Sequence, residues 1–471
     1  METSRRDFLR LSALLAAGQA FAVPARLLAG LAPSAPPNLR IGIVSDIHVD
    51  APKRDFRIFG DTRTFVKALE YFRSRKVDGV VIAGDMADTG MRYQLEIVAD
   101  AWYSVFPNDA GADGQKVEKL FIYGNHDLEG CNNWGFARRY EHKASFAKEV
   151  IANDPAKAWE DYFHEPYSPV WMKTVKGYRF VGAHWVPGHK EGVKAIEPFF
   201  AAHGAALAGE RPFFYIQHPH PKDTCHLGHA WGADDGTATR VLSRFPNAVA
   251  LSGHSHTPLT DESAIWQGAF TSVGTASLRF CAGDFKCPVT ANGYENINGT
   301  LMPKYEGVWE ARQGMLMEVF DDRLVFERRD FLRGAERLGD DWVVPLPVAA
   351  SGRPFAPENN VRASAAPQFA PGAELVVQPR GETFVCTFPA ATGVAGVRTF
   401  DWQITCERDG VARFTRHLVD YNCRNAARRA HGTVELVLAK SYFPAGTSVL
   451  AVRPRGFNGQ LGQPIRKEIT V

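Results

Sequence analysis

The stretch from Val80 to Asp88 constrains this chain most, because it joins an apolar strand to a charged end. It reads V-V-I-A-G-D-M-A-D, and a short apolar run that ends in glycine predicts a strand buried on both faces. Gly84 permits a sharp turn, so Asp85 should lie just past the strand's carboxyl end, where open α/β sheets bind ligands. A carboxylate there is costly unless it is paired or coordinates a metal ion. A single Gly-Asp is also common in ordinary turns, so the other strand ends decide between the two interpretations.

Strand-sized apolar runs recur along the first two thirds of the chain. The other runs that predict strands are Leu39–Ser45, Val117–Tyr123, Tyr178–His184, Pro212–Gln217, Asn247–Ser252, Gly314–Phe320 and Arg323–Arg329. A helix capped by Asp61 is expected after the first of them, because Phe65, Leu69 and Phe72 recur at helical spacing. This alternation favours βαβ units and a sheet with parallel strands.

Five predicted strand ends carry side chains that bind metal ions. They are Asp46 with His48, Asp85 with Asp88, Asn125 with His126, His218, and His254 with His256. Carboxylate, imidazole and amide oxygen together suit Mn, Fe or Zn, and the lack of thiolates argues against a structural zinc site. Each residue alone has an ordinary explanation, but five such ends in one order indicate a shared site.

These motifs resemble the calcineurin-like metallophosphoesterase superfamily. The matching motifs are Asp46-x-His48, Gly84-Asp85-x-x-Asp88, Gly124-Asn125-His126-Asp127, His218 and Gly253-His254-x-His256. The resemblance covers about residues 39–330. It implies an α/β fold class, a four-layered α/β/β/α metallophosphoesterase sandwich, with two metal ions at the carboxyl ends of the central strands.

The resemblance also implies a ligand set for two divalent or mixed-valence ions of Mn, Fe or Zn. One ion would be held by Asp46, His48, Asp85 and His256. The other would be held by Asp85, Asn125, His218 and His254. Two cations about 4 Å apart repel, and a bridging Asp85 and a shared hydroxide would offset that repulsion. The metal-bound hydroxide would then attack phosphorus in line with the leaving group.

His126 resembles the catalytic histidine of the family rather than a ligand. It would donate a proton or a hydrogen bond to the leaving oxygen, while Asp127 would hold its ring orientation. A purely structural His126 is the alternative. Asp88 is expected to orient ligands from outside the coordination sphere. It stands where purple acid phosphatases place a metal-binding tyrosine, which argues against that branch.

Two segments are candidates for contacting the substrate. The first, His218–Asp235, lies between two metal-binding strand ends, where His220 or Lys222 would contact phosphate oxygens and Trp231 would pack on the leaving group. A solvated loop is the alternative. The second, Ser277–Arg312, is either a lid or extended packing.

The reaction class follows from the resemblance, and the substrate is narrowed only slightly. A phosphodiester is favoured, because the third motif ends in Asp127 and so resembles small bacterial phosphodiesterases. The alternatives are a phosphomonoester, such as a nucleotide or sugar phosphate, and a non-catalytic binding module on the same fold. The formal charge of +2 gives no reason to expect nucleic acid as the partner.

The N-terminus resembles a twin-arginine export signal. Ser4–Arg10 reads S-R-R-D-F-L-R, an Ala-rich apolar run follows over Leu11–Val23, and Ala20-Phe21-Ala22 offers a cleavage site. The run is too short for a stable membrane anchor. The resemblance implies a bacterial protein exported in its folded state by the twin-arginine machinery to the periplasm or beyond. A basic start to an ordinary helix is the alternative.

At 471 residues the chain exceeds one ordinary core, which predicts two domains. The predicted boundaries are 1–32 for the signal peptide and linker, 38–330 for the catalytic domain, 331–365 for a linker and 366–471 for a C-terminal domain. Short alternating runs in that last part predict a small all-β sandwich. The seven cysteines show no metal-ligand spacing; Cys281 with Cys287, or two of the last three, could pair, and unpaired buried cysteines are the alternative.

Overall fold

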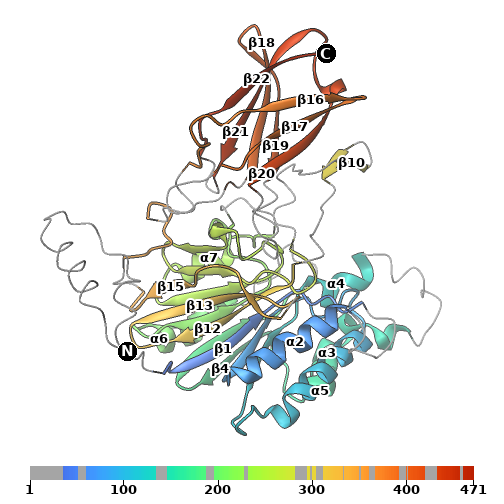
Figure 1. Ribbon diagram of the computed structural model, residues 1–471. Coiled ribbons are helices and arrows are strands. Elements are labelled where there is room, and N and C mark those ends of the chain that lie inside the picture. The colour runs from blue at the N-terminus through green and yellow to red at the C-terminus, as the bar shows by residue number, and fades with distance from the viewer. Residues whose placement is uncertain are drawn as a thin grey trace, which may run out of the picture. The chain divides into compact units, whose positions relative to one another are not determined.

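The computed structural model describes most of the chain after the predicted export signal, which itself lies outside the described residues. The described residues are 36–50, 60–133, 146–186, 196–226, 232–281, 294–297, 300–303, 311–332, 334–348, 352–359, 366–391, 399, 401–419, 432–456 and 460–471. They form two large sheets with helices along the first two thirds of the chain, and further sheets near the C-terminus (Figure 1).

The first large sheet combines three parallel strands, which lie next to one another at one side of the sheet, with antiparallel strands at the other side. Its strands are β1 (Leu39–Val44), β2 (Gly79–Ala83), β3 (Glu118–Ile122), β12 (Gln313–Val319), β13 (Arg323–Asp330), β14 (Glu336–Arg337) and β15 (Trp342–Pro345). The order is β14-β13-β12-β1-β2-β3, and β15 also pairs with β13. β1, β2 and β3 run parallel, whereas β12 pairs antiparallel with β1. The parallel part therefore sends three loops to one edge.

The second large sheet also combines parallel and antiparallel strands. Its strands are β4 (Val170–Val175), β5 (Tyr178–Ala183), β6 (Phe213–Ile216), β7 (Ala248–Ser252), β8 (Ile265–Gln267) and β9 (Thr271–Gly274). The order is β4-β5-β6-β7-β9-β8, and β5, β6, β7 and β9 run parallel. The sequence predicted β5, β6 and β7 and did not predict β4, β8 or β9.

Helices cover the outer face of each sheet. They are α2 (Gly60–Ser74), α3 (Arg92–Val105), α4 (Asn125–Asn133), α5 (Pro155–Phe163), α6 (Ile196–Leu207) and α7 (Thr237–Leu242). Side chains alternate along β2, so that Val81 joins the core between the sheets and Ile82 joins the core under α2, α3 and α5. On the second sheet, Phe214 faces the first sheet and Tyr215 packs under α6 and α7. The predicted four-layered α/β/β/α sandwich is therefore confirmed.

Two predicted boundaries were wrong. The first helix starts at Gly60, so Asp61 lies within the helix and does not precede it as a cap. The proline-rich region after residue 330 was predicted to be a linker, yet β15 pairs with β13 and buries Trp342 and Val344 in the core between the sheets. β15 is only four residues long, which is too short for its apolar alternation to stand out in the sequence. The prolines around it favoured the prediction of a linker.

The C-terminal region is all-β, as predicted. One sheet has the order β16-β17-β20, from β16 (Val376–Arg380), β17 (Thr383–Pro389) and β20 (Thr433–Ala439). The other has the order β19-β18-β21-β22, from β18 (Asp401–Arg408), β19 (Val411–Val419), β21 (Thr447–Arg455) and β22 (Ile465–Thr470). Residues of both sheets share one core around Phe388, Trp402 and Leu450, which is consistent with a β-sandwich.

The described cysteines are unpaired. Cys131, Cys225, Cys281, Cys386 and Cys406 are free and buried, so Cys386 and Cys406 do not pair with each other. Cys287 and Cys423 lie outside the described residues. Among the described helices, none is long and apolar enough to cross a membrane.

Candidate metal centre

The site lies where the parallel strands of both sheets end. β1, β2 and β3 end just before the segments that carry Asp46, Asp85 and Asn125, and β6 and β7 end just before His218 and His254. Because the central strands of each sheet run parallel, these loops leave each sheet at one edge. The two edges meet, because Nε2 of His256 in a loop of the second sheet lies 3.1 Å from Oδ1 of Asp46 in a loop of the first.

The first cluster joins a loop of the first sheet to a loop of the second. Nε2 of His256 lies 3.1 Å from Oδ1 of Asp46 and 3.2 Å from Nε2 of His48. Nε2 of His48 lies 3.8 Å from Oδ1 of Asp46. All three side chains are buried, and one ligand atom of each lies within 4.8 Å of the others.

The second cluster consists of Asp85, His218 and His254. Nε2 of His218 lies 3.0 Å from Oδ2 of Asp85 and 3.1 Å from Nδ1 of His254. Oδ2 of Asp85 also lies 3.6 Å from Nε2 of His48, which belongs to the first cluster. Asp85 therefore connects the two clusters, and a longer contact of 3.9 Å joins Nε2 of His218 to Oδ1 of Asp46.

The hydrogen bonds of two histidines leave a nitrogen lone pair for a metal ion. Nδ1 of His218 lies 2.7 Å from the carbonyl oxygen of Ala83, and Nδ1 of His256 lies 3.0 Å from the carbonyl oxygen of Phe280. A carbonyl oxygen only accepts, so each Nδ1 carries a hydrogen, and each Nε2 is the ring nitrogen that faces the cluster and can bind a metal ion once it is deprotonated. This backbone anchoring of the far nitrogen is usual for histidines that bind metals.

Asn125 and His48 give independent signs that a cation fits here. Oδ1 of Asn125 is buried and has no hydrogen-bond partner among the described residues, an arrangement that costs about 1–3 kcal/mol unless something binds the oxygen. Burial disfavours a charged His48, yet hydrogen bonds to Asp46 and Asp88 and the charge of Asp85 raise its pKa to about 10. The donor set and its negative potential therefore fit metal cations.

The backbone at the site is strained. Five site residues adopt the left-handed region, with φ of 52° at Asp46, 48° at His48, 53° at Asp85, 68° at His254 and 52° at His256. Such a conformation costs about 1–3 kcal/mol per residue outside glycine and persists where surrounding contacts outweigh it. Its concentration at the proposed ligands is typical of a functional site.

Two glycines are required by close approach. A Cβ on Gly84, whose φ is +92°, would lie 2.4 Å from Nδ1 of His218, and a Cβ on Gly124 would lie 2.2 Å from Oδ1 of Asp85. Both distances are far below van der Waals contact. The motif glycines therefore make room for the ligands themselves.

His126 lies beside the clusters, and its side chain is more open than those of His48 and His218. Its backbone N–H donates to Oδ1 of Asp85 at 2.8 Å, and its ring meets that of His48 edge-on with centroids 4.3 Å apart. Its side chain is 19% exposed, against 5% for His48 and 0% for His218. Nδ1 donates to the carbonyl oxygen of Asp88 at 2.7 Å, so Nε2 can donate a proton only when the ring is charged.

Asp127 was predicted to hold the ring of His126, and this prediction was wrong. The backbone carbonyl of Asp88 holds the ring instead. The carboxylate of Asp127 accepts hydrogen bonds from the backbone N–H groups of Gly124, Ala87 and Met86, so it ties two motif loops together. The Asp88 carboxylate lies 3.1 Å from Nδ1 of His48, which fits the expected orienting role.

Residues 39–258 match the family model described as calcineurin-like phosphoesterase. The matched range contains every residue of both clusters. These residues form a calcineurin-like phosphoesterase domain. No curated protein matches the chain in sequence.

Solved structures resemble the fold at low identity. A dimetal phosphatase from Danio rerio is 12% identical, with 66% of this chain and 99% of that chain covered and a TM-score of 0.38. The purple acid phosphatase PPD1 from yellow lupin, Lupinus luteus, is 14% identical, with 68% of this chain and 57% of that chain covered and a TM-score of 0.38. A hypothetical protein from Thermus thermophilus is 15% identical, with 66% of this chain and 100% of that chain covered and a TM-score of 0.29.

Two of the three predicted substrate residues, His220 and Lys222, lie in the described part of the phosphoesterase domain. His220 is completely buried, its ring meets that of His226 edge-on with centroids 5.0 Å apart, and burial lowers its pKa to about 3. It therefore packs in the interior, contrary to the expected contact with phosphate. Lys222 is exposed, and Trp231 lies outside the described residues.

The predicted lid at Ser277–Arg312 is described only in part. Residues 277–281 are buried or half-buried beside the first cluster, and a short hairpin of β10 (Tyr294–Ile297) and β11 (Thr300–Pro303) follows. Residues 282–293, 298–299 and 304–310 lie outside the described part. The lid stays a prediction.

Three residues of the site were missed from the sequence. The hydroxyl of Ser45 donates to Oδ2 of Asp46 at 2.5 Å. Trp185 is buried with its ring centroid 5.9 Å from that of His254. Arg279 donates to the carbonyl oxygen of His48 at 2.6 Å. Trp185 follows β5, so the strand-end rule that found the ligands could have found it.

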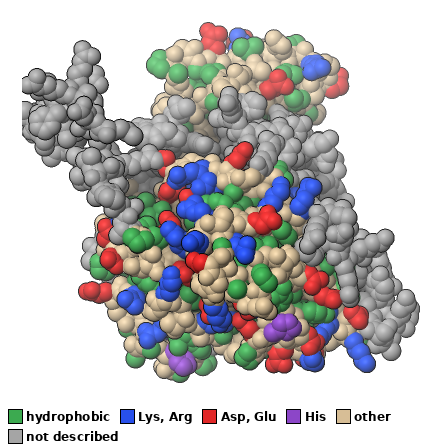
Figure 2. Space-filling view, turned by 60° about the horizontal axis from the view of Figure 1, so that its bottom comes forward, with side chains coloured by type: hydrophobic (Ala, Val, Ile, Leu, Met, Phe, Trp, Pro, Cys, Tyr) green, Lys and Arg blue, Asp and Glu red, His purple; other side chains and the backbone are tan. Residues whose placement is uncertain are grey.

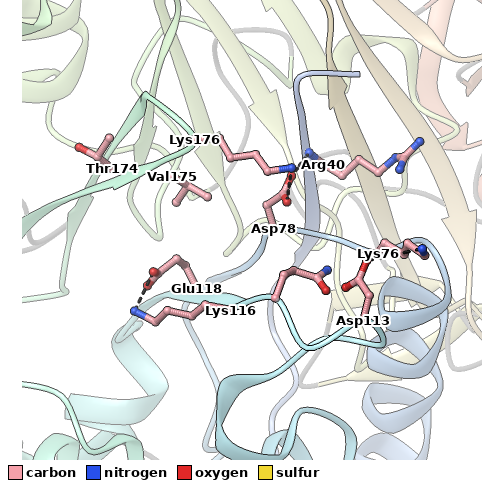
Figure 3. A pocket seen from close by; sticks show the side chains of 10 residues that line it. Arg40, Lys76, Asp78, Asp113, Lys116, Glu118, Thr174, Val175 and Lys176 are labelled. Carbon is pink, nitrogen blue, oxygen red and sulfur yellow. Dashed lines mark hydrogen bonds and ion pairs between the residues drawn. The ribbon is translucent and has the colours of Figure 1, made fainter. Parts of the chain in front are cut away.

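A second pocket of the phosphoesterase domain is lined mainly by charged side chains (Figure 3). It holds about 410 Å³ and is lined by Arg40, Lys76, Asp78, Asp113, Gln115, Lys116, Glu118, Thr174, Val175 and Lys176. Arg40 and Glu118 lie at the amino-terminal ends of β1 and β3, opposite the ends that carry the ligands. Its lysines pair with its carboxylates, as in Lys176 with Asp78 at 2.7 Å, so little charge remains to hold an ionic ligand.

Proposed function

We propose that this protein is a metal-dependent phosphoester hydrolase that uses two metal ions. The observation that carries the proposal is the pair of ligand clusters joined by Asp85, and the family match supports it. One ion would be held by Asp46, His48, Asp85 and His256. The other would be held by Asp85, Asn125, His218 and His254. The nitrogen and oxygen donors suit Mn, Fe or Zn.

When bound, such a pair acidifies a water molecule and neutralises charge on the phosphoryl oxygens. The chain's own residues supply the rest. We assign to His126 the protonation of the leaving oxygen; its imidazole, which is 19% exposed and meets the His48 ring edge-on, supports this role. Asp88 holds two rings, that of His48 through its carboxylate and that of His126 through its carbonyl. Asp127 keeps the second and third motif loops in register.

The substrate proposed is a phosphodiester. The third motif supports it, because it ends in Asp127 and so resembles that of small bacterial phosphodiesterases. We expect the Mn²⁺-reconstituted protein to hydrolyse bis(p-nitrophenyl) phosphate with a kcat/KM at least about tenfold above that for p-nitrophenyl phosphate, a difference of about 1.4 kcal/mol. Steady-state kinetics on both esters, followed by a panel of natural mono- and diesters, provide the measurement.

The same assay separates the alternatives. A reversed ratio would identify a phosphomonoesterase. A protein that binds two metal ions and turns over neither ester would instead be a non-catalytic binding module that has kept the metal site of the fold. Wild-type protein that binds none of Mn²⁺, Fe²⁺ and Zn²⁺ would contradict the proposal as a whole.

We further propose export through the twin-arginine route, supported by the Ser4–Arg10 motif and the Ala-rich run that follows it. Replacing both Arg5 and Arg6 with Lys should shift the full-length protein from the periplasmic to the cytoplasmic fraction of a bacterial host, because the receptor reads the arginine pair. Immunoblots of the fractions give the readout. An unchanged periplasmic signal in the double variant would contradict this route.

The proposed partner is a small-molecule phosphoester rather than a nucleic acid or a membrane. The formal charge of +2 supports this. On the face shown in Figure 2, basic and acidic side chains are interspersed instead of gathered by sign. A nucleic-acid partner usually requires a continuous basic surface.

A further inference from the structure

The segment Thr275–Phe280 runs between the two loops of the first cluster. It follows β9 and lies beyond the residues that match the family model, which end at 258. Thr275, Ala276, Ser277 and Leu278 are at most 3% exposed. Its contacts therefore belong to the interior of the site.

The backbone of this segment supports the loop that carries Asp46. The N–H of Leu278 donates to the carbonyl oxygen of Ser45 at 3.0 Å, and that of Arg279 donates to the carbonyl oxygen of Asp46 at 2.9 Å. The hydroxyl of Ser277 donates to the same Asp46 oxygen at 3.1 Å. These bonds help to hold Asp46 in its left-handed conformation.

The same segment supports the partner loop from the second sheet. The carbonyl oxygen of Phe280 accepts from Nδ1 of His256 at 3.0 Å, and the two rings lie with centroids 4.4 Å apart. The N–H of Thr275 donates to the carbonyl oxygen of Ser252, the last residue of β7. One short segment thus connects both halves of the first cluster.

The guanidinium of Arg279 adds the outermost contact. Nη1 donates to the carbonyl oxygen of His48 at 2.6 Å, and Nη2 pairs with the carboxylate of Asp50 at 2.7 Å. His48 is left-handed with φ of 48°, so its carbonyl direction depends on such a donor. The rigid fork of arginine reaches two acceptors at once, which the single ammonium of lysine does with less geometric control.

We propose that Arg279 is a positioning residue for one metal ion only: it holds the His48 loop so that Asp46, His48 and His256 bind the ion of the first cluster. The inference rests on the proposed two-metal function. It assigns the outer support of that ion to a segment outside the family match. Outer contacts of this kind usually change metal affinity by about 10- to 100-fold.

The test is a Mn²⁺ titration of metal-free wild-type, Arg279→Ala, Arg279→Lys and Arg323→Ala proteins, followed by calorimetry and by electron paramagnetic resonance. Arg323 is the matched control, because it pairs with Asp322 on the hairpin between β12 and β13. In Arg279→Ala we expect one site to keep its affinity and the other to weaken by about 10- to 100-fold. The signal of a coupled Mn pair should then appear only at higher Mn²⁺, with kcat restored at saturation. Arg279→Lys should fall between Arg279→Ala and wild type.

The same Arg279→Ala substitution made in an Asn125→Ala protein shows which of the two metal sites is affected. Asn125→Ala removes a proposed ligand of the ion at the second cluster, so the remaining tight site should be the first cluster, and adding Arg279→Ala should weaken it. Unchanged binding in Arg279→Ala, equal weakening of both sites, or a kcat deficit that persists at saturating Mn²⁺ would each overturn the positioning role. Thermal melts of the metal-free proteins separate these results from a loss of fold. If wild type binds none of Mn²⁺, Fe²⁺ and Zn²⁺, it is the proposed function that fails; if it binds only Fe²⁺ or Zn²⁺, the same comparison of variants is made with that ion.

Discussion

Asp85→Ala is expected to abolish hydrolysis of bis(p-nitrophenyl) phosphate and to lower the metal content below that of wild type. Oδ2 of Asp85 lies 3.0 Å from Nε2 of His218 and 3.6 Å from Nε2 of His48, so its removal takes away the carboxylate that both clusters share. A metal pair contributes several kcal/mol of transition-state stabilisation, and each 1.4 kcal/mol is about a factor of ten. The loss of kcat/KM should therefore reach at least about 10³-fold.

Asp85→Asn makes the test sharper. The amide keeps an oxygen that can accept from the backbone N–H of His126, as Oδ1 of Asp85 does at 2.8 Å, but it lacks the negative charge. It should retain the fold and still lose metal and activity. Asp113→Ala is the matched control, because Asp113 is 47% exposed and pairs with Lys76 in the pocket of Figure 3. Full activity with two bound metal ions in Asp85→Ala would refute the site assignment.

His126→Ala is expected to spare the metal content and to lower kcat by about 10²–10⁴, the usual range for general acid catalysis. The ring contacts His48 and the Asp88 carbonyl, but the His126 side chain is 19% exposed and is not among the proposed ligands. Metal analysis and kcat on the same preparation separate this role from that of a ligand.

The leaving group gives a readout that a structural role would not change. A good leaving group needs little protonation, so the deficit of His126→Ala should grow from p-nitrophenyl to alkyl leaving groups. His203→Ala, on the exposed side of α6, is the control and should behave as wild type. An unchanged kcat, or a deficit independent of the leaving group, would exclude proton donation by His126.

The ligand positions were predictable from the sequence because they follow a rule of local order. A buried strand is an apolar run, and the first polar residues after it occupy the sheet edge where ligands bind. Asp46, Asp85, Asn125, His218 and His254 all follow strands that the sequence predicted. The helical layers on the outside of the sheets were also predictable from the sequence, because alternating strands and helices place parallel strands between helical layers.

The support around those ligands was not predictable in this way. Asp127 bonds the backbone of Ala87, and the ring of His126 bonds the carbonyl of Asp88; both contacts join separate loops, and backbone partners have no sequence signature. β9 is four residues long, which is too short to show a period, so the buried segment after it was taken as part of a lid.

The sequence by itself determined the donor atoms of the site and the strand ends that carry them, because residue type and strand periodicity are local properties. The tertiary structure decided which donors face each other across the two sheets, as with Nε2 of His48 and Nε2 of His256 at 3.2 Å. It also decided that Arg279 supports His48 from a position 231 residues further along the chain. Such contacts depend on how the sheets pack, and packing is a property of the whole chain.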